Sequence, residues 1–217
     1  MRPPVRSKKT KMIRIHHTTQ RDCLFTQYNQ NHIAMTKLNR AKEFAKLKHG
    51  NSLRRDGKTP YWHHLRLVVA NLQKLGITDT SVLCAGWLHD TIEDTATDYE
   101  DIYKRFGRKC ADIVSVLTKE TRLPEPKREK LYAVQLAKST WHAKAVKLCD
   151  VLSNISDLEN SGYPKKSRKQ KVREKMIYLR AIRPGISANK SNMPGLDKIE
   201  SELNALLVQY GQKQVFF

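Results

Sequence analysis

Three separated segments of the chain carry side chains that could bind one metal ion together. His64 follows Pro60 at the start of an apolar helical pattern, His89 and Asp90 follow a second, and Asp150 interrupts a third. Burying such groups without partners is strongly unfavourable. Two imidazoles and two carboxylates suit Mn²⁺, with Fe²⁺, Zn²⁺ or Mg²⁺ as weaker candidates. We therefore predict a divalent metal site formed by these four side chains.

Two further carboxylates follow the second segment. Glu93 lies four positions after His89 and Asp94 four positions after Asp90, a spacing that places each beside a ligand on a helix. A divalent cation lowers the pKa of a bound water, and a nearby carboxylate can accept the proton. The pattern predicts metal-assisted hydrolysis, with phosphorus as the favoured centre. The plain alternative is a polar helix end.

The elements that must position these residues all have helical periodicity. Asp79 is a suitable N-cap for a helix that we expect to run to about Glu93, and Gly50 and Gly76 are typical of helix ends. No segment alternates like a strand, and no internal repeat is present. The pattern predicts an all-α fold, a single domain of roughly eight or nine helices with a basic N-terminal extension.

Composition narrows the class of protein. The chain has 217 residues, enough for one domain with a sizeable core. No apolar run reaches the length of a membrane span, so no membrane contact is predicted. The four cysteines are far apart and contain no CxxC pair, which favours a reducing compartment and a cytoplasmic location.

The net charge of +20 is concentrated in the flanks. Residues 1–40 hold nine basic side chains against one acid, and residues 159–217 hold twelve against five. Such a surplus is typical of a solvated surface, or of a protein that binds a polyanion such as RNA or a heavily phosphorylated metabolite.

The order H…HD…D is typical of the HD phosphohydrolase superfamily, and several longer motifs make the resemblance more specific. They are RAKEFAKLKHGNSLRRDGKTPYWHH (40–64), AGWLHDTIEDTAT (85–97), YKRFG (103–107), VLTK (116–119) and KLCDVLSN (147–154). Over roughly residues 38–158 the chain resembles the hydrolase domain of the RelA/SpoT-homologue family. Members remove the 3′-pyrophosphate from guanosine tetra- and pentaphosphate with Mn²⁺.

The resemblance implies a role for each candidate residue. The metal ligands would be His64, His89, Asp90 and Asp150. Glu93 and Asp94 would orient and deprotonate the attacking water, Arg55 would engage the nucleotide, and Asn154 would help to position it. The implied partner is a guanosine polyphosphate nucleotide.

The resemblance also divides the chain. Residues 1–37 would be a basic extension without fixed structure, 38–160 the hydrolase core, and 161–217 C-terminal basic helices that complete the domain. Too few residues follow the core for a synthetase domain, which implies a small, hydrolase-only member. Three positions depart from the family pattern: Asp56 replaces a usual basic residue, and Ser153 and Ser156 replace bulkier His and Arg.

Two alternatives stay open from the sequence. The same chemistry could act on another substrate, either the pyrophosphorylated 3′-end of tRNA or NADPH, and the basic flanks make RNA or tRNA contact a reasonable prediction. The chain could instead bind nucleic acid on an inactive hydrolase scaffold. Against this, no proposed ligand or carboxylate is replaced. The sequence predicts no oligomeric state.

Overall fold

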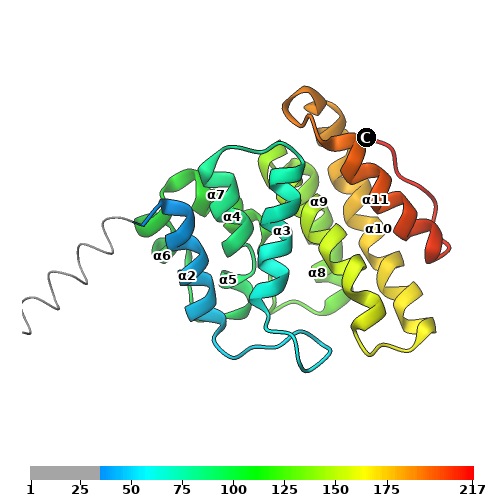
Figure 1. The fold of residues 1–217 in the computed structure, drawn as a ribbon, viewed down its shortest axis with the longest axis horizontal. Coiled ribbons are helices and arrows are strands. Elements are labelled where there is room, and N and C mark those ends of the chain that lie inside the picture. Colours follow the sequence, from blue (N-terminus) through cyan, green and yellow to red (C-terminus); the bar gives the residue numbers. More distant parts are fainter. Residues whose placement is uncertain (1–34) are drawn as a thin grey trace, which may run out of the picture. The chain divides into compact units, whose positions relative to one another are not determined.

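The structure, a computed structural model, describes residues 35–217, and in this range it contains helices and no strand (Figure 1). The α-helices are α2 (Lys37–His49), α3 (Trp62–Lys74), α4 (Thr80–Leu88), α5 (Thr91–Asp94), α6 (Tyr99–Phe106), α7 (Arg108–Leu117), α8 (Glu125–Lys138), α9 (Trp141–Ser156), α10 (Lys165–Ser187) and α11 (Leu196–Gln209). Two 3₁₀ turns, η1 (Asp157–Asn160) and η2 (Lys190–Asn192), follow α9 and α10. The all-α prediction is confirmed. Most of the predicted basic extension, residues 1–34, lies outside the described range.

Helix α9 is the centre of the bundle and packs against α3, α4, α7, α10 and α11. Every residue from Ala143 to Ser153 is buried. A helix buried on all sides is normally apolar all round. The polar residues of α9, among them Lys147, Asp150 and Ser153, must therefore find partners inside the protein.

Helices α3 and α4 lie in contact because Gly86 has no side chain. A Cβ atom at Gly86 would lie 2.7 Å from Leu72 Cδ1 and 3.0 Å from Val69 Cγ2, both on α3. The close packing brings the start of α3, where His64 lies, toward the end of α4, where His89 lies.

The predicted single helix from Asp79 to Glu93 is wrong in one respect. Asp79 is the N-cap, its carboxylate accepting from the backbone N–H groups of Ser81 and Val82, but α4 ends at Leu88 and α5 starts at Thr91. The Thr91 hydroxyl donates to the Leu88 carbonyl and stabilises this break. His89 and Asp90 lie at this break, where the His89 Nε2 and Asp90 Oδ2 atoms are 3.0 Å apart.

None of the helices in residues 35–217 is long and apolar enough to cross a membrane. The cysteines in this range, Cys84, Cys110 and Cys149, are buried free thiols within the core.

Candidate active site

The structure groups His64, His89 and Asp90 so that one ligand atom of each lies within 4.8 Å of the others, and Asp150 contacts both imidazoles of this group. His64 Nε2 lies 3.2 Å from Asp150 Oδ1, and His89 Nε2 lies 3.0 Å from Asp90 Oδ2. The two Nε2 atoms are 3.4 Å apart. The remaining imidazole–carboxylate distances are 3.7 Å from His64 to Asp90 and 3.6 Å from His89 to Asp150. Helices α3 and α9 and the α4–α5 break each supply part of the set.

These spacings fit a shared cation. Atoms that each lie about 2.1 Å from one metal ion are separated from one another by about 3.0–3.4 Å. The side chains of His64, His89 and Asp150 are at most 5 % exposed, whereas that of Asp90 is 22 % exposed. Three of the four side chains are thus shielded from solvent, and Asp90 is partly accessible to it. This arrangement is expected when a coordination position is left for water or substrate.

Both imidazoles have their Nδ1 atoms occupied, which leaves Nε2 toward the shared point. His89 Nδ1 lies 2.9 Å from the carbonyl oxygen of Gly86, which can only accept, so Nδ1 carries the proton. His64 Nδ1 lies 3.0 Å from Ser153 Oγ, a hydroxyl that can accept from it. Such partners orient a ligating imidazole and select the tautomer whose lone pair faces the metal.

The two carboxylates are also held by protein donors. Tyr61 donates its hydroxyl to Asp90 Oδ2 at 2.6 Å. Lys147 donates to Asp150 Oδ2 at 2.7 Å, and the Asn154 amide donates to Asp150 Oδ1 at 2.5 Å. The pKa of Asp150 lies well below its usual range: burial opposes ionisation, but the ammonium of Lys147 and the imidazoles outweigh it. Asp150 is therefore an anion in the interior.

Without a cation, the two imidazoles share the positive charge unequally. Burial lowers the pKa of His89, but the carboxylates of Asp90 and Asp150 more than offset this and raise it to about 10. Burial lowers the pKa of His64, which the adjacent protonated ring reinforces. The carboxylates of Asp90 and Asp150 thus stabilise one positive charge on the adjacent imidazoles, as they would stabilise a bound metal cation.

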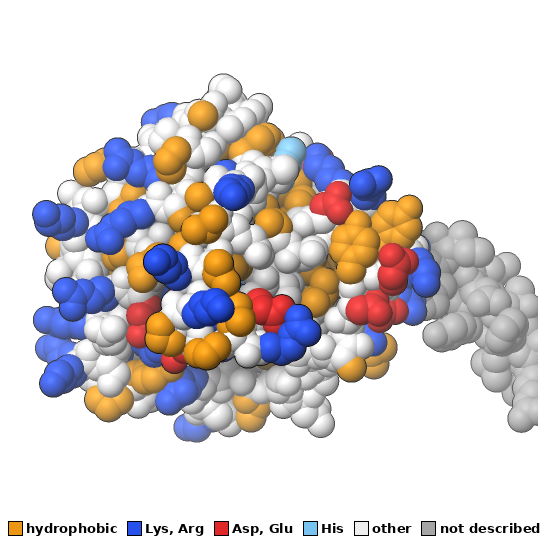
Figure 2. Space-filling view, turned by 180° about the vertical axis from the view of Figure 1, so that it is seen from behind, with side chains coloured by type: hydrophobic (Ala, Val, Ile, Leu, Met, Phe, Trp, Pro, Cys, Tyr) orange, Lys and Arg blue, Asp and Glu red, His pale blue; other side chains and the backbone are white. Residues whose placement is uncertain are grey.

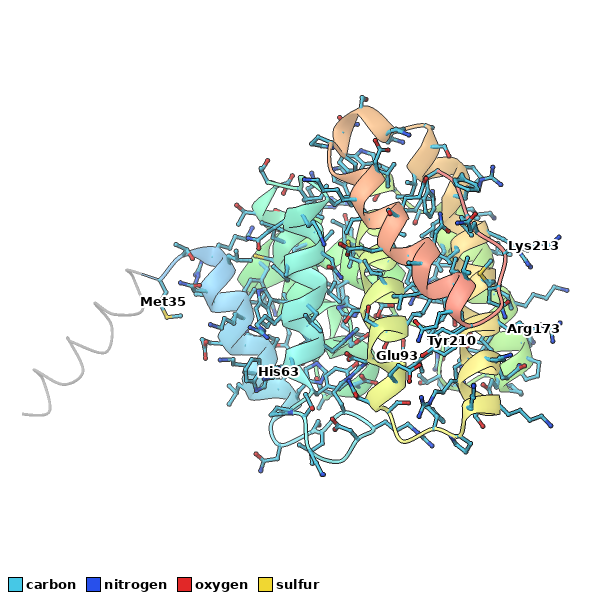
Figure 3. All side chains as sticks on the ribbon, turned by 45° about the vertical axis from the view of Figure 1, so that its right-hand side comes forward. Met35, His63, Glu93, Arg173, Tyr210 and Lys213 are labelled. Atoms are coloured by element: carbon cyan, nitrogen blue, oxygen red, sulfur yellow. The ribbon has the colours of Figure 1, made fainter. Side chains whose placement is uncertain are left out.

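Glu93 and Asp94 differ in setting. Glu93, which Figure 3 labels among the helices of the bundle, is half-buried. Its Oε2 accepts from the backbone N–H of Lys119 at 3.0 Å, which fixes the carboxylate. Asp94 is more open to water. Partial burial, together with the negative charges of Asp90 and Glu93, raises the pKa of Asp94 to about 6. Of the two, Asp94 is better suited to accept a proton near neutral pH.

A cavity of about 460 Å³ opens beside the four donors. Tyr61 and Asn154, which hydrogen-bond to the ligand carboxylates, form part of its wall. Arg54 binds Asp157 at 2.9 Å and the Asn154 side-chain oxygen at 3.2 Å. This volume is in the range of nucleotide-sized ligand sites, which runs from about 300 to 1,000 Å³.

The predicted nucleotide-binding residue, Arg55, also lines this cavity. Its guanidinium lies 3.9 Å from the centre of the Tyr163 ring, and Lys171 and Lys175 line the same space. Burial and the nearby Lys147 ammonium lower the pKa of Lys175 to about 8, so it remains largely protonated at neutral pH. The cavity wall is cationic and carries two tyrosine rings, those of Tyr61 and Tyr163.

The three departures from the family pattern have different settings. Asp56 accepts from the backbone N–H of Lys58 at 2.9 Å and of Thr59 at 2.8 Å, so it stabilises the turn that carries the two arginines. Ser153 contacts His64 as described above. Ser156 donates to the Leu152 carbonyl within α9 and is exposed.

Several residues with evident roles were not singled out from the sequence. Tyr61 and Lys147 contact ligand carboxylates, and His49 stacks on Tyr61 with ring centres 4.7 Å apart. Lys147, like Asp150, is a charged residue within an apolar run of the sequence, and this pattern could have identified it as a buried charge with a partner. His49 is buried because α2 presents Ala41, Ala45 and His49 inward.

Comparison with known proteins agrees with this geometry. The HD domain family matches residues 41–181. The guanosine-3′,5′-bis(diphosphate) 3′-pyrophosphohydrolase MESH1 of Xenopus tropicalis is 37 % identical over 71 % of this chain and 87 % of its own length. Its counterpart from Homo sapiens is 34 % identical over 79 % of this chain and 93 % of its own length.

A solved structure shows the same fold. It is a metazoan orthologue of SpoT that hydrolyses ppGpp; it has a TM-score of 0.71 and 29 % identity, and the match covers 82 % of this chain and 98 % of that one. These findings confirm the resemblance inferred from the sequence motifs.

Proposed function

Because this chain belongs to the HD domain family, in the group of the MESH1 hydrolases, we propose that it is a guanosine-3′,5′-bis(diphosphate) 3′-pyrophosphohydrolase. One observation carries the proposal: two adjacent imidazoles, each within 3.7 Å of both the Asp90 and the Asp150 carboxylate, lie beside a cationic, nucleotide-sized cavity. An inactive scaffold is disfavoured, since no member of this set is missing or turned away.

We assign the metal ligands as His64, His89, Asp90 and Asp150, and Mn²⁺ as the resident cation. The balance of nitrogen and oxygen donors supports Mn²⁺ over Mg²⁺, which prefers oxygen alone, and Fe²⁺ and Zn²⁺ are the nearer competitors. When bound, the cation supplies acidification of water and polarisation of a phosphoryl oxygen.

The protein's own residues then have separate tasks. Asp94 takes the proton of the attacking water, and Glu93, held by the Lys119 backbone N–H, orients that water. Arg55 and Asn154 line the cavity and bind the nucleotide. Attack of water on the phosphorus that is bonded to the 3′ oxygen breaks the P–O3′ bond, which releases pyrophosphate and leaves a 3′-hydroxyl on the nucleoside.

The free, buried thiols of the described core support a cytoplasmic location. The substrate is tested by incubating the purified full chain and Mn²⁺ with guanosine tetraphosphate, and in parallel with NADPH. Pyrophosphate and guanosine 5′-diphosphate are the expected products, with the double variant E93Q/D94N as the inactive control. Faster turnover of NADPH than of guanosine tetraphosphate would reassign the substrate.

A further inference from the structure

Two lysines of the central helix α9 are buried. Figure 2 shows Lys and Arg side chains spread over the surface of one face of the protein, where water solvates their charges. Lys144 and Lys147, by contrast, are only 6 % and 7 % exposed. Lys144 donates to the backbone carbonyl oxygen of Ser139, a neutral partner. Lys147 donates to the Asp150 carboxylate at 2.7 Å, so it is the one of the two that contacts a candidate metal ligand.

Two aromatic rings enclose the Lys147 ammonium. Its Nζ lies 5.0 Å from the centre of the Tyr132 ring and 4.7 Å from that of Tyr178. The two ring centres are 5.3 Å apart, and the rings are nearly perpendicular, at 85°. Both tyrosines are at most 3 % exposed, and their hydroxyls donate to other protein groups. Ring faces attract a cation, and the attraction is stronger away from water. The ammonium is therefore fixed beside Asp150.

A second lysine contacts the same two rings and has its own counter-charge. Lys119 Nζ lies 5.3 Å from each ring centre and pairs with Glu129 at 3.1 Å. Within residues 35–217, Lys147 forms one ion pair, the one with Asp150. The charge of Lys147 is therefore balanced by a candidate metal ligand and by no other carboxylate of that range at ion-pair distance.

Lys147 and the two imidazoles contact different oxygens of Asp150. Lys147 donates to Oδ2, whereas Oδ1 lies 3.2 Å from His64 Nε2 and 3.6 Å from His89 Nε2. Oδ1 is thus the oxygen available to a cation that the imidazoles also bind, and Lys147 can stay on Oδ2. Asp150 then shares one negative charge between two positive charges. These repel each other, and the repulsion is strong in a buried site.

Without a metal ion, the same ion pair has a stabilising effect. Asp150 is 4 % exposed, and removing one partner of a buried ion pair is strongly destabilising because the other charge is left without compensation. Lys147 therefore stabilises the metal-free arrangement of the ligands. Whatever stabilises the metal-free state relative to the loaded state lowers the affinity for the metal.

We propose that Lys147 is an internal counter-ion that competes with the divalent cation for Asp150. It keeps the ligands assembled in the metal-free protein and weakens the affinity of the site for its cation, so that the cation can exchange. Lys147 is a positioning residue, since it acts through Asp150 and does not line the cavity beside the site. The inference rests on the proposed function in one respect, the assignment of the four side chains as metal ligands.

The test uses the full chain and compares K147M with K144M. Both substitutions replace a buried lysine of α9 by an apolar side chain of similar length, and Lys144 bonds to a backbone carbonyl instead of a ligand. A further variant, K147Q, removes the charge but keeps a hydrogen-bond donor, and it decides the question if K147M fails to fold. Two quantities are measured at one fixed pH, because protons compete with Mn²⁺ for the imidazoles. They are the Mn²⁺ affinity, by competition with a chromophoric chelator, and the urea midpoint of the metal-free protein.

K147M should bind Mn²⁺ at least about tenfold more tightly than the wild type, because the competing charge is gone. Its metal-free form should have a lower urea midpoint, and saturating Mn²⁺ should raise that midpoint by more than it does in the wild type. K147Q should also bind Mn²⁺ more tightly. K144M should lower the urea midpoint and leave the Mn²⁺ affinity unchanged.

An unchanged or weaker Mn²⁺ affinity in the Lys147 variants would overturn the proposal, since Lys147 would then only orient Asp150 or support the fold. Equal tightening in K144M would overturn it too, because the loss of any buried lysine would suffice. Neither measurement depends on turnover, so a different substrate would leave the result unaffected. A wild type that binds no Mn²⁺ would instead refute the metal assignment, and the role of Lys147 with it.

Discussion

Replacing Ser153 by alanine should weaken metal binding without removing any ligand. In the wild type the Ser153 hydroxyl accepts from His64 Nδ1 at 3.0 Å, and both side chains are about 1 % exposed. The variant leaves a buried imidazole N–H without an acceptor. The unmet donor costs about 1–3 kcal/mol, which corresponds to about a 5- to 150-fold loss in an equilibrium constant. Losses of about 10- to 100-fold are typical when the partner of a metal-ligating histidine is removed.

The assay is competition for Mn²⁺ against a chromophoric chelator, which reads affinity directly and does not depend on turnover. S156A is the matched control, because Ser156 lies one turn along the same helix and its hydroxyl donates to the Leu152 carbonyl, with no hydrogen bond to a candidate ligand within residues 35–217. We expect S153A to bind Mn²⁺ about 10- to 100-fold more weakly than S156A. Equal affinities for the two variants would refute the idea that Ser153 orients His64.

Three other substitutions test separate parts of the account. D150A should abolish Mn²⁺ binding, measured by equilibrium dialysis, because it removes a buried charged ligand and leaves Lys147 unpaired; full occupancy would place the site elsewhere. D94N should retain Mn²⁺ but lower kcat by about 100-fold. The wild-type pH–rate profile should rise with pH through an apparent pKa at or below about 6, because the base acts in its deprotonated form and a bound cation lowers the pKa of Asp94 further. If the same rise at acidic pH persists in D94N, Asp94 is not the base. G86A should lower the free energy of unfolding by about 1–3 kcal/mol, measured by denaturant titration, because the added methyl meets α3; an unchanged midpoint would show that α3 and α4 can separate at no cost.

The helical class and the grouping of the candidate metal ligands could be predicted from the sequence for one reason. His64, His89 and Asp150 are polar groups inside apolar helical patterns, and such groups need partners wherever the helices pack. The same reasoning applies to Lys147, a charged residue inside the apolar pattern of α9 that also needs a buried partner. A buried lysine three residues before Asp150 is the internal counter-charge of that carboxylate.

The α4–α5 break could not be predicted in the same way. Local propensity favours a continuous helix through His89 and Asp90, and the Thr91 hydroxyl bond that stabilises the break depends on the exact end of α4. The contact between Ser153 and His64 joins residues 89 positions apart and exists only once α3 packs on α9.

The most direct test of the central claim is a titration of metal-free protein with Mn²⁺, in which pyrophosphate release from guanosine tetraphosphate is followed at protein concentrations far above the metal dissociation constant. The account predicts no release before metal is added, a linear rise, and a plateau at one equivalent per chain, with guanosine 5′-diphosphate as the nucleotide product. Full activity in the chelated protein, or release of orthophosphate in place of pyrophosphate, would contradict it.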